Sequence, residues 1–256
     1  MGESSVRITL LGGVGEIGRN CFCLEHDDRI LVVDCGLMFP DADMPGVDLV
    51  LPDFSYLREN AERVEAVLIT HAHEDHAGGL PYLLAEVPCP VYGSQLSLSF
   101  ARRRIEEAGL MGATELIAVR DGERRSIGPF DCEFIPVTHS VPHGFATAFH
   151  TPMGTIVHSG DFKIDLTPVD GRQTDLALLG EADLSVHRTG RLRENGVVAR
   201  SAAASDGAAA TMERRQAHAR LATHHGERRL RAVERPARRG EAALLVALAI
   251  ADHDRL

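Results

Sequence analysis

Short apolar runs and stretches of alternating apolar and polar residues predict a series of strands in the first 180 residues. The predicted strands are Val6–Leu11, Cys21–Leu24, Ile30–Val33, Ala66–Thr70, Phe134–Val137, Thr147–His150 and Thr155–His158. Two turns are also predicted, at 27–28 and at 152–154, because Asp pairs and Pro-Met-Gly favour them.

Helical spacing of apolar residues occurs between some of these strands, at Leu57–Val64, Leu80–Glu86 and Leu96–Ala108. In the last segment Leu96, Phe100 and Ile105 fall on one side, which we predict to be the buried side. Strands in adjacent groups with intervening helices are typical of sheets covered by helices. The pattern therefore predicts an α/β layered domain rather than strict βαβ winding.

The composition changes sharply after residue 180. All nine Phe and all three Tyr precede residue 163, and residues 181–256 hold 14 of the 26 Arg. In that stretch Leu, Ile, Val and Phe total 14 of 76 residues, too few to build a core. We therefore predict a folded domain over 1–180 and an Ala/Arg-rich tail over 181–256 that is disordered or frameshifted. A nucleic-acid-binding arm is the less favoured alternative, because acidic residues are interspersed in it.

Several classes of protein are excluded by the sequence. The longest strongly apolar run, 242–251, is ten residues, whereas a membrane-spanning helix needs about 20. The N-terminus shows no secretory signal, so we expect a cytoplasmic protein with no membrane partner. The five cysteines form no CxxC pair and are odd in number, which favours free thiols over a disulfide framework.

Residues 13–18 read GVGEIG, a literal GxGxxG after a predicted strand. Dinucleotide binding would require a helix to follow, so that its N-terminus meets the pyrophosphate. Residues 20–26 instead read NCFCLEH, which suits a strand. We therefore predict that these glycines form a tight turn between two strands.

Residues 71–76, HAHEDH, place four ligand-type side chains directly after a predicted strand. On such a loop His71 and His73 can face one metal while Asp75 and His76 face a second. Imidazoles and carboxylates suit zinc where thiolates are absent. A chance occurrence of this pattern is rare, so the alternative of a polar surface loop is disfavoured.

Further candidates follow other predicted strands. His139 and Asp161 are candidate metal ligands, and Asp34 is a candidate partner that orients a ligating histidine. A two-metal site of this kind performs hydrolysis. The sequence contains no GxSxG or SxxK motif of a serine nucleophile.

These motifs together resemble the metallo-β-lactamase superfamily and, within it, the ribonuclease J family of the β-CASP branch. The resemblance covers about residues 6–178 and rests on five segments in the same order: GGVGEIGRN (12–20), DCGLMFP (34–40), THAHEDHAGGLP (70–81), PVTHSVP (136–142) and VHSGDFKID (157–165).

The resemblance implies the first half of a metallo-β-lactamase-like αββα sandwich and a zinc-dependent nuclease that degrades RNA from the 5′ end and also cuts internally. It implies that His71, His73 and His139 bind one Zn²⁺. Asp75 and His76 would bind the other, with Asp161 bridging, and Asp75 and His76 would act with a metal-bound water. Asp34 matches an acidic residue of the family. RNA is the implied partner, and the intact family suggests a homo-oligomer.

The chain departs from the family's pattern after residue 180. We find no β-CASP segment, no closing half of the lactamase core and no candidate for a further metal-ligand histidine. Our hypothesis is a frameshift near residues 177–190, and we expect weak or no activity from the chain as written. The alternatives are another binuclear zinc hydrolase, such as a thioester hydrolase or lactamase, and a non-catalytic truncated product.

Overall fold

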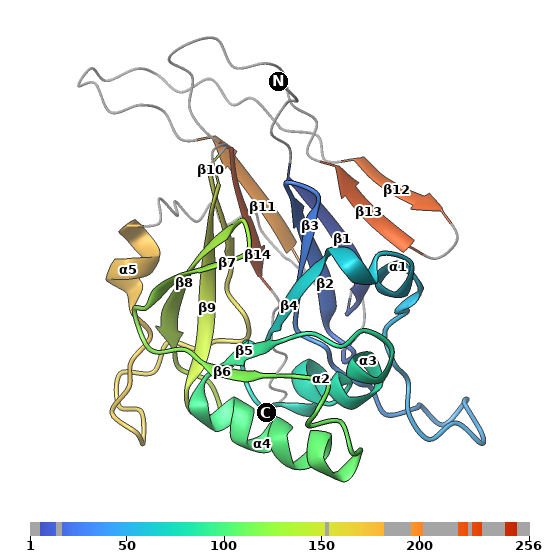
Figure 1. The fold of residues 1–256 in the computed structure, drawn as a ribbon. Coiled ribbons are helices and arrows are strands. Elements are labelled where there is room, and N and C mark those ends of the chain that lie inside the picture. The colour runs from blue at the N-terminus through green and yellow to red at the C-terminus, as the bar shows by residue number, and fades with distance from the viewer. Residues whose placement is uncertain are drawn as a thin grey trace.

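The computed structural model describes residues 6–13, 17–151 and 154–181, together with the backbone of four strands between residues 196 and 249; side chains are described up to residue 179. Two sheets lie face to face, with α1 (Ser55–Glu59), α3 (Leu80–Glu86) and α4 (Gln95–Glu107) around the first and α5 (Leu176–Glu181) beside the second (Figure 1).

The first sheet combines antiparallel and parallel pairing. Before residue 180 its strands are β1 (Arg7–Gly12), β2 (Cys21–His26), β3 (Arg29–Val33), β4 (Val64–Leu68), β5 (Val91–Gly93) and β6 (Leu116–Ala118). β2 pairs antiparallel with both β1 and β3, and β3 to β6 pair in parallel. Parallel neighbours end at the same edge of a sheet, so the segments that follow β3 and β4 emerge side by side.

The second sheet is an antiparallel meander in its described N-terminal part. It contains β7 (Arg124–Ile127), β8 (Phe130–Val137), β9 (Gly144–Thr151) and β10 (Gly154–His158). Strand β8 and strand β10 both pair with β9, so they run in the same direction, and the segments after them also share one edge.

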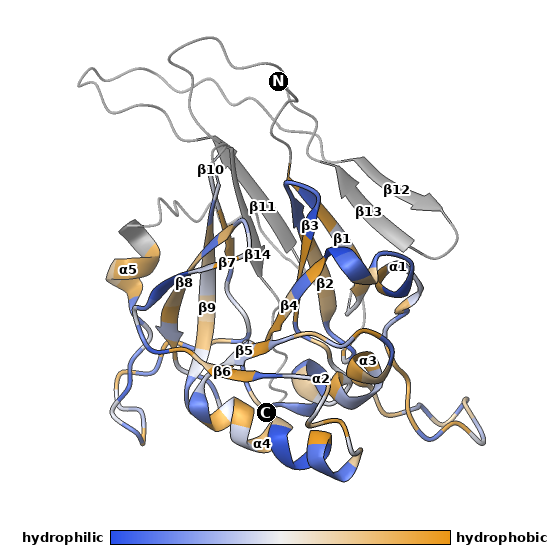
Figure 2. Ribbon diagram, in the orientation of Figure 1, coloured by the Kyte–Doolittle hydropathy of each residue, from blue (hydrophilic) through white to orange (hydrophobic). Residues whose placement is uncertain are grey.

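Three buried clusters explain why the layers stack in this order. One lies between the sheets and includes Phe22, Leu68, Phe134 and Phe149. Another joins the outer face of the first sheet to α1, α3 and α4, and a third joins the second sheet to Leu178 and Leu179 of α5. Residues 21–24 of β2, and β4 apart from Glu65, are correspondingly apolar (Figure 2). The predicted α/β layering and the incomplete αββα sandwich are thus confirmed.

Two sequence-based expectations about helices are wrong. Residues 57–64 are not one helix. α1 ends at Glu59, a 3-10 turn covers Ala61–Arg63, and Val64 already begins β4. In α4 Phe100 is 59% exposed, and the buried side contains Leu98, Ala101 and Ile105 instead. Helical spacing identified α4 itself, but the sheet decides which side it covers.

The glycine-rich segment leads from one strand to the next, and the predicted tight turn includes residues 14–16, which lie outside the described residues. β1 pairs antiparallel with β2, which begins at Cys21, and the described residues between them, 13 and 17–20, contain no helix. Asp27 and Asp28 form the predicted turn with φ of 47° and 61°, and Thr151 pairs with Gly154 across the predicted 152–154 turn.

The four remaining strands are β11 (Gly196–Ser201), β12 (Arg220–His224), β13 (Glu227–Arg231) and β14 (Leu244–Ala249). β13 pairs with β1 and β14 with β10. Most of residues 182–256 lie outside the described residues, so the domain boundary at 180 and the nature of the tail stay predictions. Over the described part of the chain, no helix has the length and hydrophobicity of a membrane span.

Candidate metal centre

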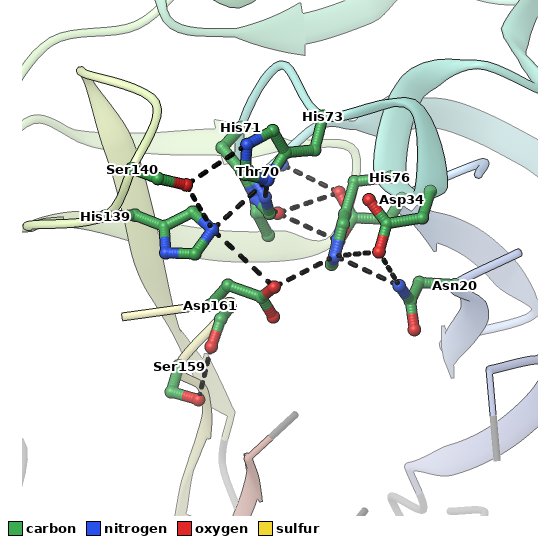
Figure 3. Close-up of polar contacts among 12 residues, drawn as sticks. Asn20, Asp34, Thr70, His71, His73, His76, His139, Ser140, Ser159 and Asp161 are labelled. Carbon is green, nitrogen blue, oxygen red and sulfur yellow. Dashed lines mark hydrogen bonds and ion pairs between the residues drawn. The ribbon is translucent and has the colours of Figure 1, made fainter. Parts of the chain in front are cut away.

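The side chains predicted from the sequence come together where strands of both sheets end, as Figure 3 shows for those that it labels. Asp34 follows β3, and His71 and His73 follow β4. Asp75 and His76 lie on the short helix α2 (Glu74–Ala77). His139 follows β8 and Asp161 follows β10, from the second sheet. The site therefore lies across the junction of the two sheets.

Backbone hydrogen bonds fix the position of α2. The Asn20 amide donates to the Asp75 carbonyl (2.9 Å), and the Cys35 amide donates to the His76 carbonyl (2.7 Å). Gly36 permits this close approach, because a Cβ there would lie 1.6 Å from the Asp75 carbonyl oxygen. The HAHEDH loop is thus held against the segment that follows β3.

The first group of potential ligands is His71, His73, His139 and Asp161. His73 Nδ1 lies 3.0 Å from His71 Nε2 and 3.2 Å from His139 Nε2. His139 Nε2 lies 3.8 Å from Asp161 Oδ2. Tetrahedral zinc with N ligands at 2.0–2.1 Å requires ligand atoms about 3.3 Å apart. The two imidazole pairs that include His73 already have nearly that spacing.

The second group is Asp75, His76 and, again, Asp161. His76 Nε2 lies 3.6 Å from Asp75 Oδ2 and 3.5 Å from Asp161 Oδ2. Asp161 thus lies between the two groups, as Figure 3 shows. The first group offers four donors and the second three among the described residues.

Asp34 forms hydrogen bonds that link it to both ligand groups, directly to His76 and through Thr70 to His71. Its carboxylate accepts hydrogen bonds from the Thr70 amide (2.8 Å), from the Thr70 hydroxyl (2.9 and 3.0 Å) and from His76 Nδ1 (2.7 Å). Since the Thr70 hydroxyl gives its proton to Asp34, its oxygen accepts from His71 Nδ1 at 3.0 Å. Both His71 and His76 therefore have Nε2 turned toward the ligand groups.

Burial and neighbouring charges set the protonation of these groups. Burial, together with the charge of His76, holds the pKa of His71 well below its usual value, so His71 is a neutral ligand. Burial opposes charge on His76, but the Asp34 carboxylate and a hydrogen bond with Asp161 raise the pKa of His76 to about 10. Burial likewise opposes ionisation of Asp34, yet the charge of His76 keeps its pKa below the usual range.

Arg172 braces the segment that carries His139. Its guanidinium donates to the carbonyls of Val137 (2.8 Å) and Gly144 (2.9 Å), at the two ends of that segment. It also forms a bidentate pair with Asp121, both distances 2.7 Å, and lies over the Phe145 ring. The position of His139 therefore depends on a residue far along the chain.

Four contributing residues were not identified from the sequence. Asn20 Nδ2 lies 3.0 Å from His76 Nε2 and 3.3 Å from Asp75 Oδ2. Thr70 holds Asp34 and His71, as described above. Ser140 Oγ lies 3.3 Å from His73 Nε2, and buried His158 Nε2 lies 3.8 Å from Asp34 Oδ2. Their positions at strand ends or beside the predicted motifs were the only available signal.

Other histidines do not join the ligand groups. His150 pairs with Glu133 at 2.8 Å on the second sheet. His143 is exposed, with φ of 60°. Neither belongs to the two groups found among the described residues. The side chains of the histidines after residue 180 lie outside the described residues.

The donor set fits divalent metal ions. Asp161 is buried, and its Oδ1 has no hydrogen-bond partner, although an unpaired buried carboxylate oxygen is costly. Three imidazole nitrogens, from His71, His73 and His139, converge beside it. Metal ions at the two groups would satisfy these atoms, and His71, His73, His139, Asp75, His76 and Asp161 are the residues that would hold them.

Comparison with known proteins places these residues in context. The family described as Metallo-beta-lactamase superfamily matches residues 14–185. Ribonuclease J of Synechocystis sp. is 46% identical over 179 residues, covering 69% of this chain and 28% of that protein. Ribonuclease J of Mycolicibacterium smegmatis is 42% identical over 190 residues, covering 73% of this chain and 34% of that protein. These matches confirm the resemblance inferred from the sequence motifs.

Among solved structures, the metallo-beta-lactamase fold protein YhfI from Bacillus subtilis aligns with a TM-score of 0.47 and 21% identity, covering 62% of this chain and 64% of that one. The chain spans about a third or less of the length of the two ribonuclease J proteins above.

Proposed function

This chain belongs to the metallo-beta-lactamase superfamily, and we propose that residues 1–180 form the zinc-dependent hydrolytic centre of a cytoplasmic ribonuclease of the ribonuclease J type. Its substrate is RNA, cut from the 5′ end and internally. A homo-oligomeric assembly is part of the same proposal, which is drawn from the resemblance. The similarity to ribonuclease J over the first 70% of the chain supports the substrate class.

One observation carries the hydrolytic assignment. Asp161 lies between two donor groups, with Oδ2 3.8 Å from His139 and 3.5 Å from His76. Two divalent ions bound to these groups would activate a water and neutralise charge that develops on the attacked phosphate. The residues of the chain hold the ligand nitrogens in place: Asp34 and Thr70 fix the tautomers of His71 and His76, and Asn20 steadies Asp75 and His76.

We further propose that the chain as written has very weak or no ribonuclease activity. The second group has three donors among the described residues, one of them shared with the first group, and an incompletely coordinated ion is bound weakly. Residues 1–180 are also acidic, with 13 Lys or Arg against 27 Asp or Glu. Such a surface gives no electrostatic help in holding RNA.

The test compares hydrolysis of 5′-monophosphorylated RNA with hydrolysis of a thioester and a β-lactam, at equal zinc. The enzymes compared are the 256-residue chain, a version with the downstream frame restored, and His76→Ala in the restored version. We expect RNA cleavage by the restored version, little by the present chain and none by the variant. Faster turnover of the thioester or lactam would overturn the substrate assignment. Activity of the present chain near that of the restored version would overturn the proposed weakness.

A further inference from the structure

A pocket of 610 Å³ opens beside the second ligand group, and its chemistry differs from that of the metal centre. Five apolar side chains line it, namely Ile17, Leu37, Met38, Phe39 and Met44. Its volume lies within the range usual for small-molecule sites. Asp75 forms part of the wall and also belongs to the second ligand group. A part of a substrate held in this pocket would therefore lie next to the part that reacts at the metal centre.

The apolar lining is unusually open to solvent. Phe39 is 65% exposed and Ile17 is 76% exposed. Single exposed apolar residues are ordinary on protein surfaces. Here, however, two large ones line a single cavity next to a cluster of metal-ligand side chains. An aromatic ring kept in water beside reacting groups is typical of a surface that stacks against a ligand.

The charges of the pocket exclude a phosphate as its occupant. Asp41, Glu74 and Asp75 line it, and the described lining residues include no lysine, arginine or histidine. Glu74 is paired with Arg104 outside the lining, and Asp75 Oδ2 lies 3.3 Å from Asn20 Nδ2, so Asp41 is the carboxylate left to face a ligand. An anion here would be repelled, whereas a neutral group could donate hydrogen bonds from its N–H groups to the carboxylate oxygens.

We propose that this pocket binds a nucleobase of the substrate, one that carries an exocyclic amine, with its flat face against Phe39. Bases offer a π-face for stacking and N–H groups for carboxylate acceptors, which are the two features that this lining recognises. The proposal rests on the proposed RNA hydrolysis and names the part of the RNA next to the scissile phosphate that the chain holds. The phosphate lies at the ligand groups and the base on the other side of Asp75.

The test uses two probes that separate base from phosphate. Adenosine has the base and no phosphate, and ribose 5-phosphate has the phosphate and no base. Binding of each to the 256-residue chain is followed by the NMR signals of the probe, for the wild type and for Phe39→Ala, Phe39→Tyr and Phe100→Ala. Phe100 is a matched control because it is 59% exposed on α4 and does not line the pocket.

We expect adenosine to bind the wild type, Phe39→Tyr and Phe100→Ala alike, and to bind Phe39→Ala about tenfold more weakly, the loss of one base–aromatic stack. The affinity for ribose 5-phosphate should be the same in Phe39→Ala as in the wild type. The proposal is overturned if adenosine does not bind, if Phe39→Ala binds it as tightly as the wild type, or if an apolar peptide binds in its place. Adenosine binding without RNA hydrolysis in the restored version would instead contradict the proposed function alone.

Discussion

At the scale of single residues, Asp34 controls both ligand groups although it belongs to neither. It accepts from Thr70 and from His76 Nδ1 and, through Thr70, sets the tautomer of His71. We predict that Asp34→Asn weakens zinc binding about 10- to 100-fold, the usual cost of losing an orienting partner. Asparagine tolerates the φ of 58° at this position, so the backbone should not move. Competition with a chromogenic chelator measures the affinity.

Asp131→Asn is the control for this change. Asp131 is a partly exposed carboxylate paired with Arg124 at 2.5 Å on the second sheet, and its loss should leave zinc affinity unchanged. Unaltered zinc binding in Asp34→Asn would show that the imidazoles are oriented by their own packing instead.

At the scale of elements, the contact between α2 and the segment after β3 positions Asp75 and His76. A Cβ on Gly36 would meet the backbone of Asp75 at 1.6 Å, and backbone atoms cannot give way as a flexible side chain can. We predict that Gly36→Ala lowers the free energy of unfolding by roughly 3 kcal/mol, the upper end of overpacking costs. Urea denaturation followed by circular dichroism measures it. Gly112→Ala is the control, because nothing lies within 4 Å of its added Cβ, and equal stability of the two variants would contradict the argument.

The same scale includes the brace formed by Arg172 across the segment between β8 and β9. Arg172→Lys cannot reach both carbonyls and Asp121, because lysine lacks the planar fork of the guanidinium. We predict that it destabilises the fold by about 2 kcal/mol and weakens zinc binding at the first ligand group, where His139 would be a ligand, more than at the second. Titration with Co²⁺, whose absorption spectrum reports coordination at each ligand group, measures the metal affinity of the two groups.

Arg124→Lys serves as the control for Arg172→Lys, since Arg124 is 56% exposed and, among the described residues, pairs with Asp131. It should change stability by less than about 0.5 kcal/mol. Equal loss of both ions in Arg172→Lys would show that the brace acts on the whole fold rather than on the position of His139.

At the scale of the whole molecule, metal ions would join the two sheets. His71 and His73 follow a strand of the first sheet, whereas His139 and Asp161 follow strands of the second. We predict one tightly bound zinc and one weaker, because the groups offer four and three donors among the described residues. Removing the tight zinc with a chelator should lower the free energy of unfolding by roughly 3 kcal/mol when zinc is at about 100 times its Kd. Calorimetry and metal analysis check both parts.

His139→Ala should abolish this metal-dependent stabilisation, whereas His150→Ala should keep it, because His150 pairs with Glu133 away from the centre. Two zinc ions of equal affinity would contradict the assignment of an incomplete second group. A melting temperature that does not change when zinc is added would contradict the claim that metal ions link the two sheets.

Much of the site could be predicted from the sequence because its chemistry is local. His71, His73, Asp75 and His76 lie within six residues. So dense a cluster of ligand-type side chains directly after a strand indicates metal binding. His139, Asp161 and Asp34 could be proposed because side chains at strand ends gather at sheet edges. The layered fold followed from the spacing of apolar residues, since burial on one face leaves a period in the sequence.

Only the tertiary structure decided which side chains support these ligands and which surfaces stay open. Asn20 reaches Asp75 across 55 positions and Arg172 reaches Gly144 across 28, and no local pattern records such pairs. Phe100 has helical spacing suited to burial yet remains exposed, because the packing of α4 against the sheet leaves that side uncovered. The helical spacing of apolar residues indicates which residues can be buried. Whether it is buried depends on what the rest of the chain brings against it.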